Sequence, residues 1–358
     1  MLHAVIMAGG SGTRFWPQSR RELPKQFLRM GTERTLIQET AARCEPLVSP
    51  DRLWVVTGAL HAAEAGRQLS QLKAEQFLVE PAARNTAPCI GLAAIRLLKD
   101  DPDALMLLVP ADHVISPANA FHDAVRRAVT LVSQHPEALV LFGVPPNYPA
   151  TGFGYIQRGE ALEFDHHAAH RVMGFHEKPN LVTAARYVAS DDYYWNCGIF
   201  VWRAQAILNA LAQFGPDIYA HLENLRSALG TSEWSNTLER EFPAMPSISI
   251  DYAVLEKANN VYVLPAPFQW DDVGSWQALT RLKPPDSDGN LIDGLYCGVD
   301  TAGCIIRSNG EHLVATLGVR DLIVVHTPTA TLVADKRDEA AIRRLIAELE
   351  RQGLERFL

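Results

Sequence analysis

Short apolar runs recur along the first 145 residues and alternate with longer stretches that have helical spacing. Brief apolar runs are typical of buried strands, and apolar positions three to four residues apart indicate helices. Strands that alternate with helices predict right-handed βαβ units around a mainly parallel sheet. The predicted strands cover residues 4–7, 53–58, 76–80, 105–109 and 138–143, and the predicted helices cover residues 36–44, 62–72, 89–98 and 121–132.

The pattern changes near residue 150, where antiparallel strands are expected in place of βαβ units. A turn-rich segment at residues 283–290 then favours a linker. We therefore predict a Rossmann-like α/β domain over residues 1–285, with a mixed, mainly parallel sheet and flanking helices, and a small β domain with a closing helix over residues 286–358. The later predicted strands cover residues 151–156, 172–179, 195–200, 304–308, 313–317 and 322–326, and the later helices cover residues 204–214, 216–229 and 335–349.

Composition narrows the class of protein. The chain has 358 residues, 47% of them hydrophobic, and a net charge of −8, which argues against nucleic acid as a partner. Apolar runs stay well short of a membrane span, and the N-terminus shows no signal-peptide pattern, so we expect no membrane association. Five scattered cysteines without a C-x-x-C pair favour reduced thiols and a cytoplasmic protein.

One stretch has the opposite charge from the rest of the chain. Residues 11–30 contain five cations and one anion, a local charge of +4, and they follow an apolar run that ends in three glycines within four positions. Glycines allow positive φ and let an anion approach the backbone amides, so a polyphosphate ligand is indicated. The dinucleotide fingerprint does not fit, because Phe15 stands where its third glycine belongs, and the Walker A sequence is absent.

The pattern G-x-G-T-R-x-x-P, followed by P-K, resembles the signature of the sugar-phosphate nucleotidyltransferases. Nine motifs in order resemble the bacterial mannose-1-phosphate guanylyltransferases (GDP-mannose pyrophosphorylases) more closely. They are AGGSGTR, PKQF, EPAARNTAP, PADH, GFGYI, FHEKP, WNCGIF, SIDYAV and WDDVGSW, and they extend from residue 3 to about residue 280.

This resemblance implies a Mg²⁺-dependent enzyme that converts GTP and mannose 1-phosphate to GDP-mannose and pyrophosphate. It also implies that the C-terminal β domain is β-helix-like, and we expect that domain to form a homodimer. Some members of the family carry a following phosphomannose isomerase domain. The chain ends too soon after residue 286 to hold one, so a single-function form is expected.

The resemblance also suggests which residues bind the nucleotide. The attacking phosphate is already an anion at neutral pH, so the site needs cations rather than a general base, and Arg14 and Lys25 are the expected catalytic residues. A carboxylate can accept two hydrogen bonds from guanine, and Glu80 is the candidate, with helix capping as its alternative role. The full nucleotide-binding set is Ala8, Gly9, Gly10, Ser11, Gly12, Thr13, Glu80, Asn85 and Thr86.

Two aspartates are the expected metal ligands. The resemblance assigns Asp112 and Asp272 to Mg²⁺, which prefers a few carboxylate oxygens together with substrate phosphates. Their alternative role is that of capping or turn residues, and Asp271 competes with Asp272 for the second position. The expected sugar-phosphate contacts are Gly154, Glu177, Lys178 and Asn196, although Glu177 and Lys178 would also suit a solvated surface pair.

Three other functions stay open at this point. The chain could use another sugar 1-phosphate or another nucleoside triphosphate, act as a catalytically silent nucleotide-sugar sensor, or serve mainly in assembly through its C-terminal domain. An enzyme is favoured over a sensor because the expected charged residues are all retained, namely Arg14, Lys25, Asp112, Lys178 and Asp272.

Overall fold

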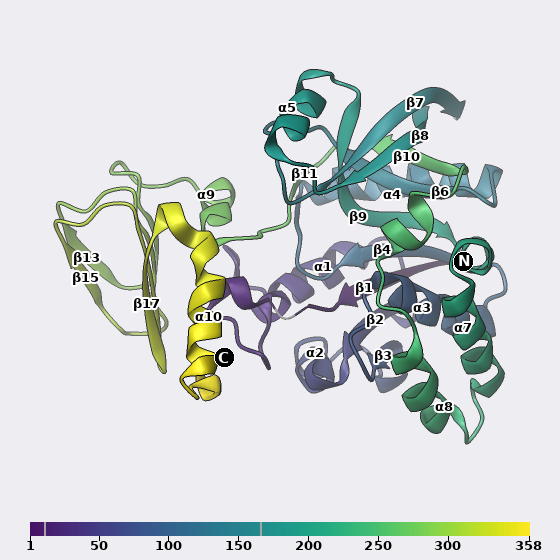
Figure 1. Cartoon of the computed structure of the whole chain (residues 1–358), viewed down its shortest axis with the longest axis horizontal. Helices are drawn as coiled ribbons and strands as arrows, with labels where there is room; N and C mark the ends of the chain where they lie inside the picture. Colours follow the sequence, from purple (N-terminus) through teal and green to yellow (C-terminus); the bar gives the residue numbers. More distant parts are fainter. Residues whose placement is uncertain (11, 165–166) are drawn as a thin grey trace. The chain divides into compact units, whose positions relative to one another are not determined.

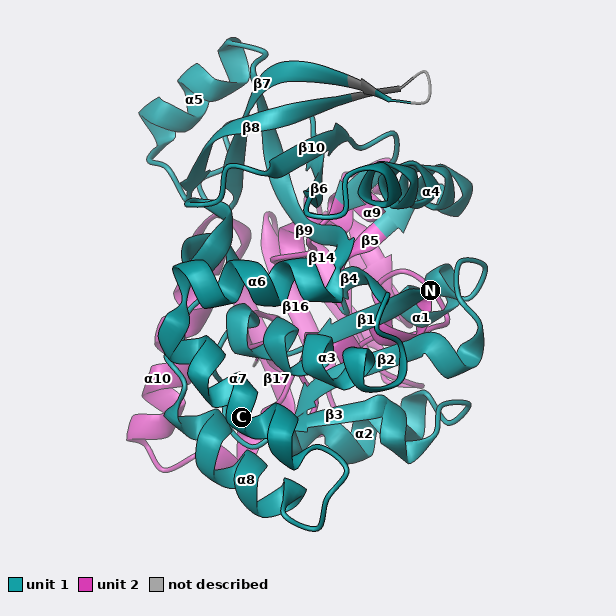
Figure 2. Cartoon of the chain, turned by 90° about the vertical axis from the view of Figure 1, so that its right-hand side faces the viewer, with its two compact units in different colours: residues 1–9, 40–111, 115–270 teal, residues 10–39, 112–114, 271–358 magenta. Residues whose placement is uncertain are grey.

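A nine-stranded mixed sheet forms the centre of the larger of two units into which the chain divides (Figures 1 and 2). The computed structural model describes residues 1–10, 12–164 and 167–358. Unit 1 comprises residues 1–9, 40–111 and 115–270, and unit 2 comprises residues 10–39, 112–114 and 271–358.

The sheet of unit 1 has the strand order β3-β2-β1-β4-β9-β6-β10-β8-β7. Strands β1 to β4 run parallel to one another, whereas β9 pairs antiparallel with both β4 and β6. The segments expected to be antiparallel after residue 150 pair as β7 with β8. The strands are β1 (Leu2–Ala8), β2 (Leu53–Gly58), β3 (Phe77–Glu80), β4 (Leu105–Pro110), β6 (Leu139–Val144), β7 (Gly154–Phe164), β8 (His167–Glu177), β9 (Tyr193–Arg203) and β10 (Val261–Pro265).

Helices cover both faces of this sheet. Alternate residues of β6 point to opposite faces, so Leu141 joins the core beneath α3, α6 and α7, while Phe142 packs against Phe268, which contacts Phe121 of α4. The helices of this unit are α2 (Ala62–Gln68), α3 (Thr86–Asp100), α4 (Ala118–Gln134), α5 (Leu181–Ala189), α6 (Ala204–Phe214), α7 (Pro216–Ala228) and α8 (Trp234–Glu241), and the elements α1 (Leu36–Cys44), β5 (Val114–Ser116) and β11 (Gln269–Asp271) contain residues of both units.

Unit 2 is built on short parallel strands in two narrow sheets. One has the order β12-β14-β16-β17, in which the first three strands are parallel, and the other pairs β13 with β15 in parallel. Successive short parallel strands of this kind give a β-helix-like coil. Its elements are β12 (Leu291–Asp293), β13 (Tyr296–Val299), β14 (Ile305–Arg307), β15 (Val314–Leu317), β16 (Leu322–Thr327), β17 (Ala330–Asp335), α9 (Leu279–Leu282) and α10 (Ile342–Arg351), with the 3-10 turns η1 (Thr13–Phe15), η2 (Lys25–Phe27), η8 (Trp276–Ala278) and η9 (Lys336–Ala341).

The core of unit 2 joins the N-terminal segment to the C-terminal strands. Phe15 packs edge-on against Trp276, with 4.9 Å between ring centroids, in one cluster with Ile305 and Ile323. Residues 10–39 and 271–285 therefore belong to the same compact unit as the C-terminal strands. The sequence predicts a domain boundary between residues 285 and 286. The division into compact units does not test whether the segments on either side fold independently, so this boundary stays a prediction.

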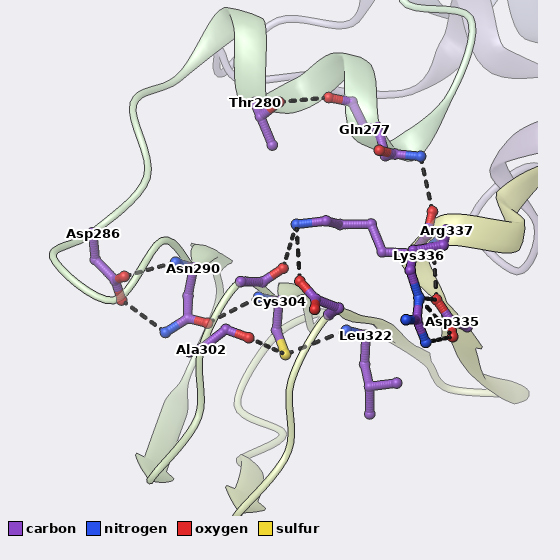
Figure 3. Close-up of polar contacts among 12 residues, drawn as sticks. Gln277, Thr280, Asp286, Asn290, Ala302, Cys304, Leu322, Asp335, Lys336 and Arg337 are labelled. Carbon is purple, nitrogen blue, oxygen red and sulfur yellow. Dashed lines mark hydrogen bonds and ion pairs between the residues drawn. The ribbon is translucent and has the colours of Figure 1, made fainter.

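Polar contacts hold the turns of the coil (Figure 3). Asn290 donates to the carbonyl of Thr301 (3.0 Å) and accepts from the amide of Cys304 (2.9 Å). The side chain of Gln277 donates to the carbonyl of Lys336 (2.8 Å), and the Lys336 ammonium donates to the carbonyl of Gly303 (2.5 Å). The two bonds of Lys336 fix the point at which the chain leaves β17 for the C-terminal helix. Within the described ranges, no helix is long and apolar enough to cross a bilayer.

Candidate active site

Gly12 brings the glycine loop against Lys25. Its φ is +54°, and a Cβ built on it would lie 2.3 Å from the backbone nitrogen of Lys25 and 2.9 Å from its Cβ. Any larger residue would therefore push the two segments apart as well as strain the backbone. Thr13 and Arg14 follow in η1, and the exposed Arg14 guanidinium donates to the carbonyl of Gly274 (3.4 Å).

Lys25 links the two predicted metal ligands. Its side chain is only 8% exposed, and its ammonium donates to Asp112 Oδ2 at 2.8 Å and to the backbone carbonyl of Asp272. Burial works against ionisation of Asp112, but the charges of Lys25 and His113 outweigh it and lower the pKa of Asp112. The pKa of Asp272 is instead raised, mainly by burial, with Asp271 and Asp112 adding to the effect against the pull of Lys25. Lys25 therefore lowers the pKa of both carboxylates, but burial outweighs its effect at Asp272.

Asp271 has a different set of partners. It accepts two hydrogen bonds from Arg281 (2.5 and 2.9 Å) and one from the amide of Val273 (2.7 Å). Val273 has a positive φ of 44°, so Asp271 stabilises a strained turn. Asp272 lines a cavity instead, close to Gly274, where a Cβ would lie 2.8 Å from Asp272 Oδ2.

These residues surround a cavity of about 420 Å³ within unit 2. Three cations reach it, two from the N-terminal segment and one from the C-terminal helix, together with two carboxylates. A cavity with this charge pattern suits a polyphosphate and a divalent cation. It is lined by Gly12, Thr13, Arg14, Phe15, Lys25, Asp112, His113, Asp272, Gly274 and Arg343.

The two aspartates fit a magnesium ion by donor chemistry. Among residues 1–10, 12–164 and 167–358 there is no cluster of three or more histidine, cysteine or carboxylate ligands. Mg²⁺ does not need one, because it commonly takes one or two carboxylates and completes its shell with water and substrate phosphates. The raised pKa of Asp272, to which Asp112 contributes, shows that a further cation near this pair would be favourable.

Glu80 lies at the end of β3, in unit 1, with a buried carboxyl group. Its Oε1 has no hydrogen-bond partner among the described residues. Burial raises the pKa of Glu80 to about 7, and a hydrogen bond with Cys89 partly opposes this. A buried acceptor without a partner is costly, which motivates a guanine-binding role for Glu80 but leaves that role a prediction.

Asn85 and Thr86 are occupied by structural bonds. Asn85, at φ 65°, caps α3 by accepting from the amide of Thr86 (2.8 Å). The Thr86 hydroxyl accepts from the amide of Ile250 (2.8 Å). These bonds position the start of α3, and whether either residue also binds a nucleotide remains a prediction.

The predicted sugar-phosphate residues gather in unit 1 at the ends of β7, β8 and β9. Gly154 begins β7, and a Cβ there would lie 2.5 Å from Glu177 Oε2, so a larger residue would displace that carboxylate. Lys178, at φ 47°, forms an ion pair with Glu177 (2.7 Å) while its side chain stays 64% exposed. The Lys178 ammonium is therefore accessible to an anion.

Asp251 is a residue that the sequence reading did not single out, although it lies in the motif SIDYAV. It accepts from the side-chain amide of Asn196 at 3.0 Å. Burial and the nearby charge of Glu177 raise the pKa of Asp251 to about 6. The signal available in the sequence was an acidic residue between apolar neighbours, which is also compatible with a capping position.

The structure thus forms two groups from the predicted residues. Arg14, Lys25, Asp112 and Asp272 meet in unit 2, and the sugar-phosphate residues meet in unit 1. Ala8 ends β1, Gly9 and Gly10 are exposed, and Ser11 lies outside the described residues. The assignment of Ser11 therefore stays a prediction.

Comparisons with known proteins agree with this architecture. Residues 3–288 match a family model described as nucleotidyl transferase, and residues 294–349 match the MannoseP isomerase/GMP-like beta-helix domain. The chain is 40% identical over 357 residues to a mannose-1-phosphate guanylyltransferase of Klebsiella pneumoniae, covering 98% of this chain and 74% of that protein. Mannose-1-phosphate guanylyltransferase ManC of Salmonella typhimurium is 40% identical over 359 residues, with the same two coverages.

Solved structures give the same result. A Thermus thermophilus protein described as mannose-1-phosphate geranyltransferase superposes with a TM-score of 0.86 at 34% identity, covering 98% of this chain and 99% of that one. A protein of Helicobacter pylori described as mannose-6-phosphate isomerase has a TM-score of 0.61 at 26% identity, covering 75% of this chain and 99% of that one.

The sheet, the glycine loop and the two matched domains define a nucleotidyltransferase with a C-terminal β-helix domain. The chain belongs to the mannose-1-phosphate guanylyltransferase family. The predicted fold class and the predicted family are therefore confirmed.

Proposed function

We propose that this protein transfers a guanylyl group from GTP to mannose 1-phosphate, giving GDP-mannose and pyrophosphate. The observation that carries the proposal is the cavity of unit 2, where Arg14 and Lys25 lie with Asp112 and Asp272. Family membership supplies the reaction class, and the cavity supplies the charges that this reaction needs.

The reaction is an in-line substitution at the α-phosphorus. An oxygen of the sugar phosphate forms a new P–O bond while the bond to the β-phosphate oxygen breaks, so pyrophosphate leaves with that electron pair. No proton has to be removed from the nucleophile, because its second pKa is about 6. Catalysis then depends on positioning and on neutralising several negative charges brought together.

The residues divide this work among them. Lys25, held between Asp112 and the backbone of Asp272, is suited to the reacting phosphate, and Arg14 is suited to the leaving pyrophosphate. Asp112 and Asp272 would hold Mg²⁺, which when bound neutralises phosphate charge as a Lewis acid. The pairing of Asp271 with Arg281 supports Asp272 as the second ligand.

Unit 1 would provide the recognition groups. The unpartnered oxygen of Glu80 suits the adjacent N1–H and N2–H donors of guanine. The exposed Lys178 suits the phosphate of mannose 1-phosphate, and Glu177 and Asn196 suit its hydroxyls. Gly154 keeps space for Glu177. The predicted nucleotide-binding residues Ala8 to Thr13, Asn85 and Thr86 remain part of the proposal.

The proposal includes a homodimer and a cytoplasmic location. The dimer is supported by exposed apolar residues on the β-helix, among them Val299 and Leu317. The cytoplasmic location rests on the proposed substrates, a nucleoside triphosphate and a sugar phosphate.

The direct test is pyrophosphate release measured over a matrix of nucleoside triphosphates and sugar 1-phosphates, with and without MgCl₂. We expect GTP with mannose 1-phosphate to give the highest kcat/KM and to require the metal. Preference for another pair would correct the substrates while keeping the reaction. No release with any pair, despite binding of a nucleotide sugar, would identify a sensor.

A further inference from the structure

The C-terminal helix brings an arginine into the cavity of the catalytic cluster. Arg343 is the second residue of α10 and lines the same cavity as Arg14, Lys25 and Asp272. Charged residues of an amphipathic helix usually lie on its solvated face. The fold instead packs α10 against η1, which contains Arg14.

Arg343 differs from the arginines beside it in having no partner. Arg337 is bound by Asp335, and Arg344 by Asp338, at 2.6 and 2.8 Å respectively. Arg343 forms no hydrogen bond or ion pair with any residue in the described part of the chain. An exposed guanidinium that lines a cavity and lacks a counter-charge is suited to an anionic ligand.

The surroundings make this end of the cavity basic. A second cavity of about 450 Å³ shares Arg14, Gly274 and Arg343 with the first and adds Arg337, while Glu339 is its acidic residue. Glu339 is already engaged, since it accepts from the amides of Trp276 and Gln277. The carboxylates Asp112 and Asp272 line only the first cavity, so Arg14 and Arg343 define a cationic end away from them.

The position of Arg343 is fixed by its neighbours. Ile342 is buried in the core of unit 2, and the helix is tied to the N-terminal segment by the ion pair of Arg21 with Glu350 (2.5 Å). The indole of Trp16 also donates to the carbonyl of Phe357 (2.7 Å). The backbone of Arg343 is therefore held in place before any ligand arrives, so that only its side chain has to be ordered on binding.

We propose that Arg343 binds the outer phosphates of the nucleoside triphosphate, and the pyrophosphate that leaves, together with Arg14. This inference rests on the proposed function and deepens it, because it makes the C-terminal helix part of the active site. The ligand class is an inorganic pyrophosphate or the β,γ-phosphates of a nucleotide.

The test uses the full chain with Arg343→Gln and Arg343→Lys, and with Arg344→Gln as the matched control. The control removes an equal charge from the next residue, which is paired with Asp338 and does not line either cavity. Binding of inorganic pyrophosphate with MgCl₂ is measured by titration calorimetry, alongside the KM for each substrate and the melting temperature.

We expect Arg343→Gln to weaken pyrophosphate binding by roughly tenfold or more, as for a lost charge-assisted hydrogen bond. The KM for GTP should rise, the KM for mannose 1-phosphate should change little, and Arg343→Lys should recover part of the loss. Arg344→Gln should match the wild type.

Equal pyrophosphate affinity in wild type and Arg343→Gln would overturn the inference. So would a lowered melting temperature with both KM values raised alike, because that pattern marks a structural role. If the wild type releases no pyrophosphate from any substrate pair but still loses pyrophosphate affinity on Arg343→Gln, the proposed function fails and the anion site of Arg343 stands.

Discussion

Asp112 and Asp272 show how one buried lysine gives two carboxylates different properties. The ion pair with Lys25 favours the charged form of Asp112, whereas Asp272 contacts Lys25 only through its backbone carbonyl. At the side chain of Asp272, burial and the repulsion of Asp271 and Asp112 outweigh the attraction of Lys25. A bound cation would therefore favour the charged form of Asp272.

Replacing either aspartate by asparagine should reduce turnover by at least ~10²-fold, the scale of lost transition-state electrostatics. Stability of the metal-free protein should separate the two variants. Because the pKa of Asp112 is lowered in the folded protein, its ionisation stabilises the fold at neutral pH. That stabilisation is lost as the pH falls through the folded pKa. Asp112→Asn removes the charge and should therefore lower the melting temperature. Asp272→Asn should leave the melting temperature equal or higher, because its pKa is raised.

Steady-state kinetics and thermal melts at pH 7.5, with and without MgCl₂, would check this. Asp271→Asn is the control, and it should keep turnover near normal while weakening the turn held by Arg281. Near-normal turnover in Asp272→Asn together with a severe loss in Asp271→Asn would move the metal ligand by one residue.

Glu80 offers a test that combines specificity with pH. Glu80→Gln replaces one acceptor by a donor facing the donors of guanine, so it should lower kcat/KM for GTP more than for ATP. The pKa of about 7, against an ordinary 4.5, predicts that ionisation destabilises the unliganded wild type as pH rises from 4.5 through 7, by at most about 3 kcal/mol.

Denaturant unfolding at pH 5 and pH 8 would measure that difference. The variant should gain stability relative to the wild type at pH 8 and little at pH 5. An unchanged preference for GTP over ATP would show that the base is recognised elsewhere, whatever the stability data give.

At the scale of elements, local pattern predicted the first four strands of the main sheet but missed others, among them β10 in the same sheet and β17 of the coil. The apolar run at residues 105–109 forms β4 (Leu105–Pro110). A short continuous apolar segment is typical of a strand whose two faces are both buried. The C-terminal helix begins seven residues later than expected, at Ile342, because Asp338 departs from helical φ/ψ and the preceding residues form a 3-10 turn.

What the local pattern could not predict depends on contacts between distant segments. Phe15 packs against Trp276, which is 261 residues away, and Arg343 lines the cavity of the N-terminal cations. No local sequence pattern predicts either contact. The charge balance of residues 11–30 indicated an anion site, which stays a prediction. Of the five cations, Arg14 and Lys25 line the cavity, whereas Arg21 forms an ion pair with Glu350.

The glycine loop can be tested as an element through Gly12→Ala. The change places a Cβ against the backbone of Lys25, so it should displace the lysine and reduce turnover by about tenfold or more. It should also cost roughly 1–2 kcal/mol for the positive φ.

Gly310→Ala is the matched control, since Gly310 has φ +66° and a Cβ added there would meet no described atom within 4 Å. It should show the same backbone cost with normal turnover. Equal turnover in the two variants would mean that the contact between Gly12 and Lys25 does not position the catalytic lysine.

At the scale of the whole molecule, the proposed dimer has a candidate surface on the β-helix. The parallel strands β13 and β15 place Val299 beside Leu317, and these side chains are 55% and 74% exposed. Leu295 and Leu313, the residues just before these two strands, are also about half exposed. Contiguous exposed apolar side chains are characteristic of an interface.

We expect the wild type to be a dimer and Leu317→Asp to be a monomer, because a charge at the centre of an apolar interface would have to be buried without a partner. Light scattering at several protein concentrations would measure the mass. Val333→Asp is the control, since Val333 is 63% exposed but belongs to β17, in the other sheet of the coil.

Point substitutions are preferable here to removal of the C-terminal segment. Phe15 and Leu28 share a core cluster with Ile305 and Ile323, so a chain cut near residue 285 would expose the packing side of the catalytic segment. A loss of activity would then say nothing about assembly. Leu317→Asp leaves that core intact, so a monomer with normal melting temperature would assign the dimer to this face, and a dimer in that variant would place the contact elsewhere.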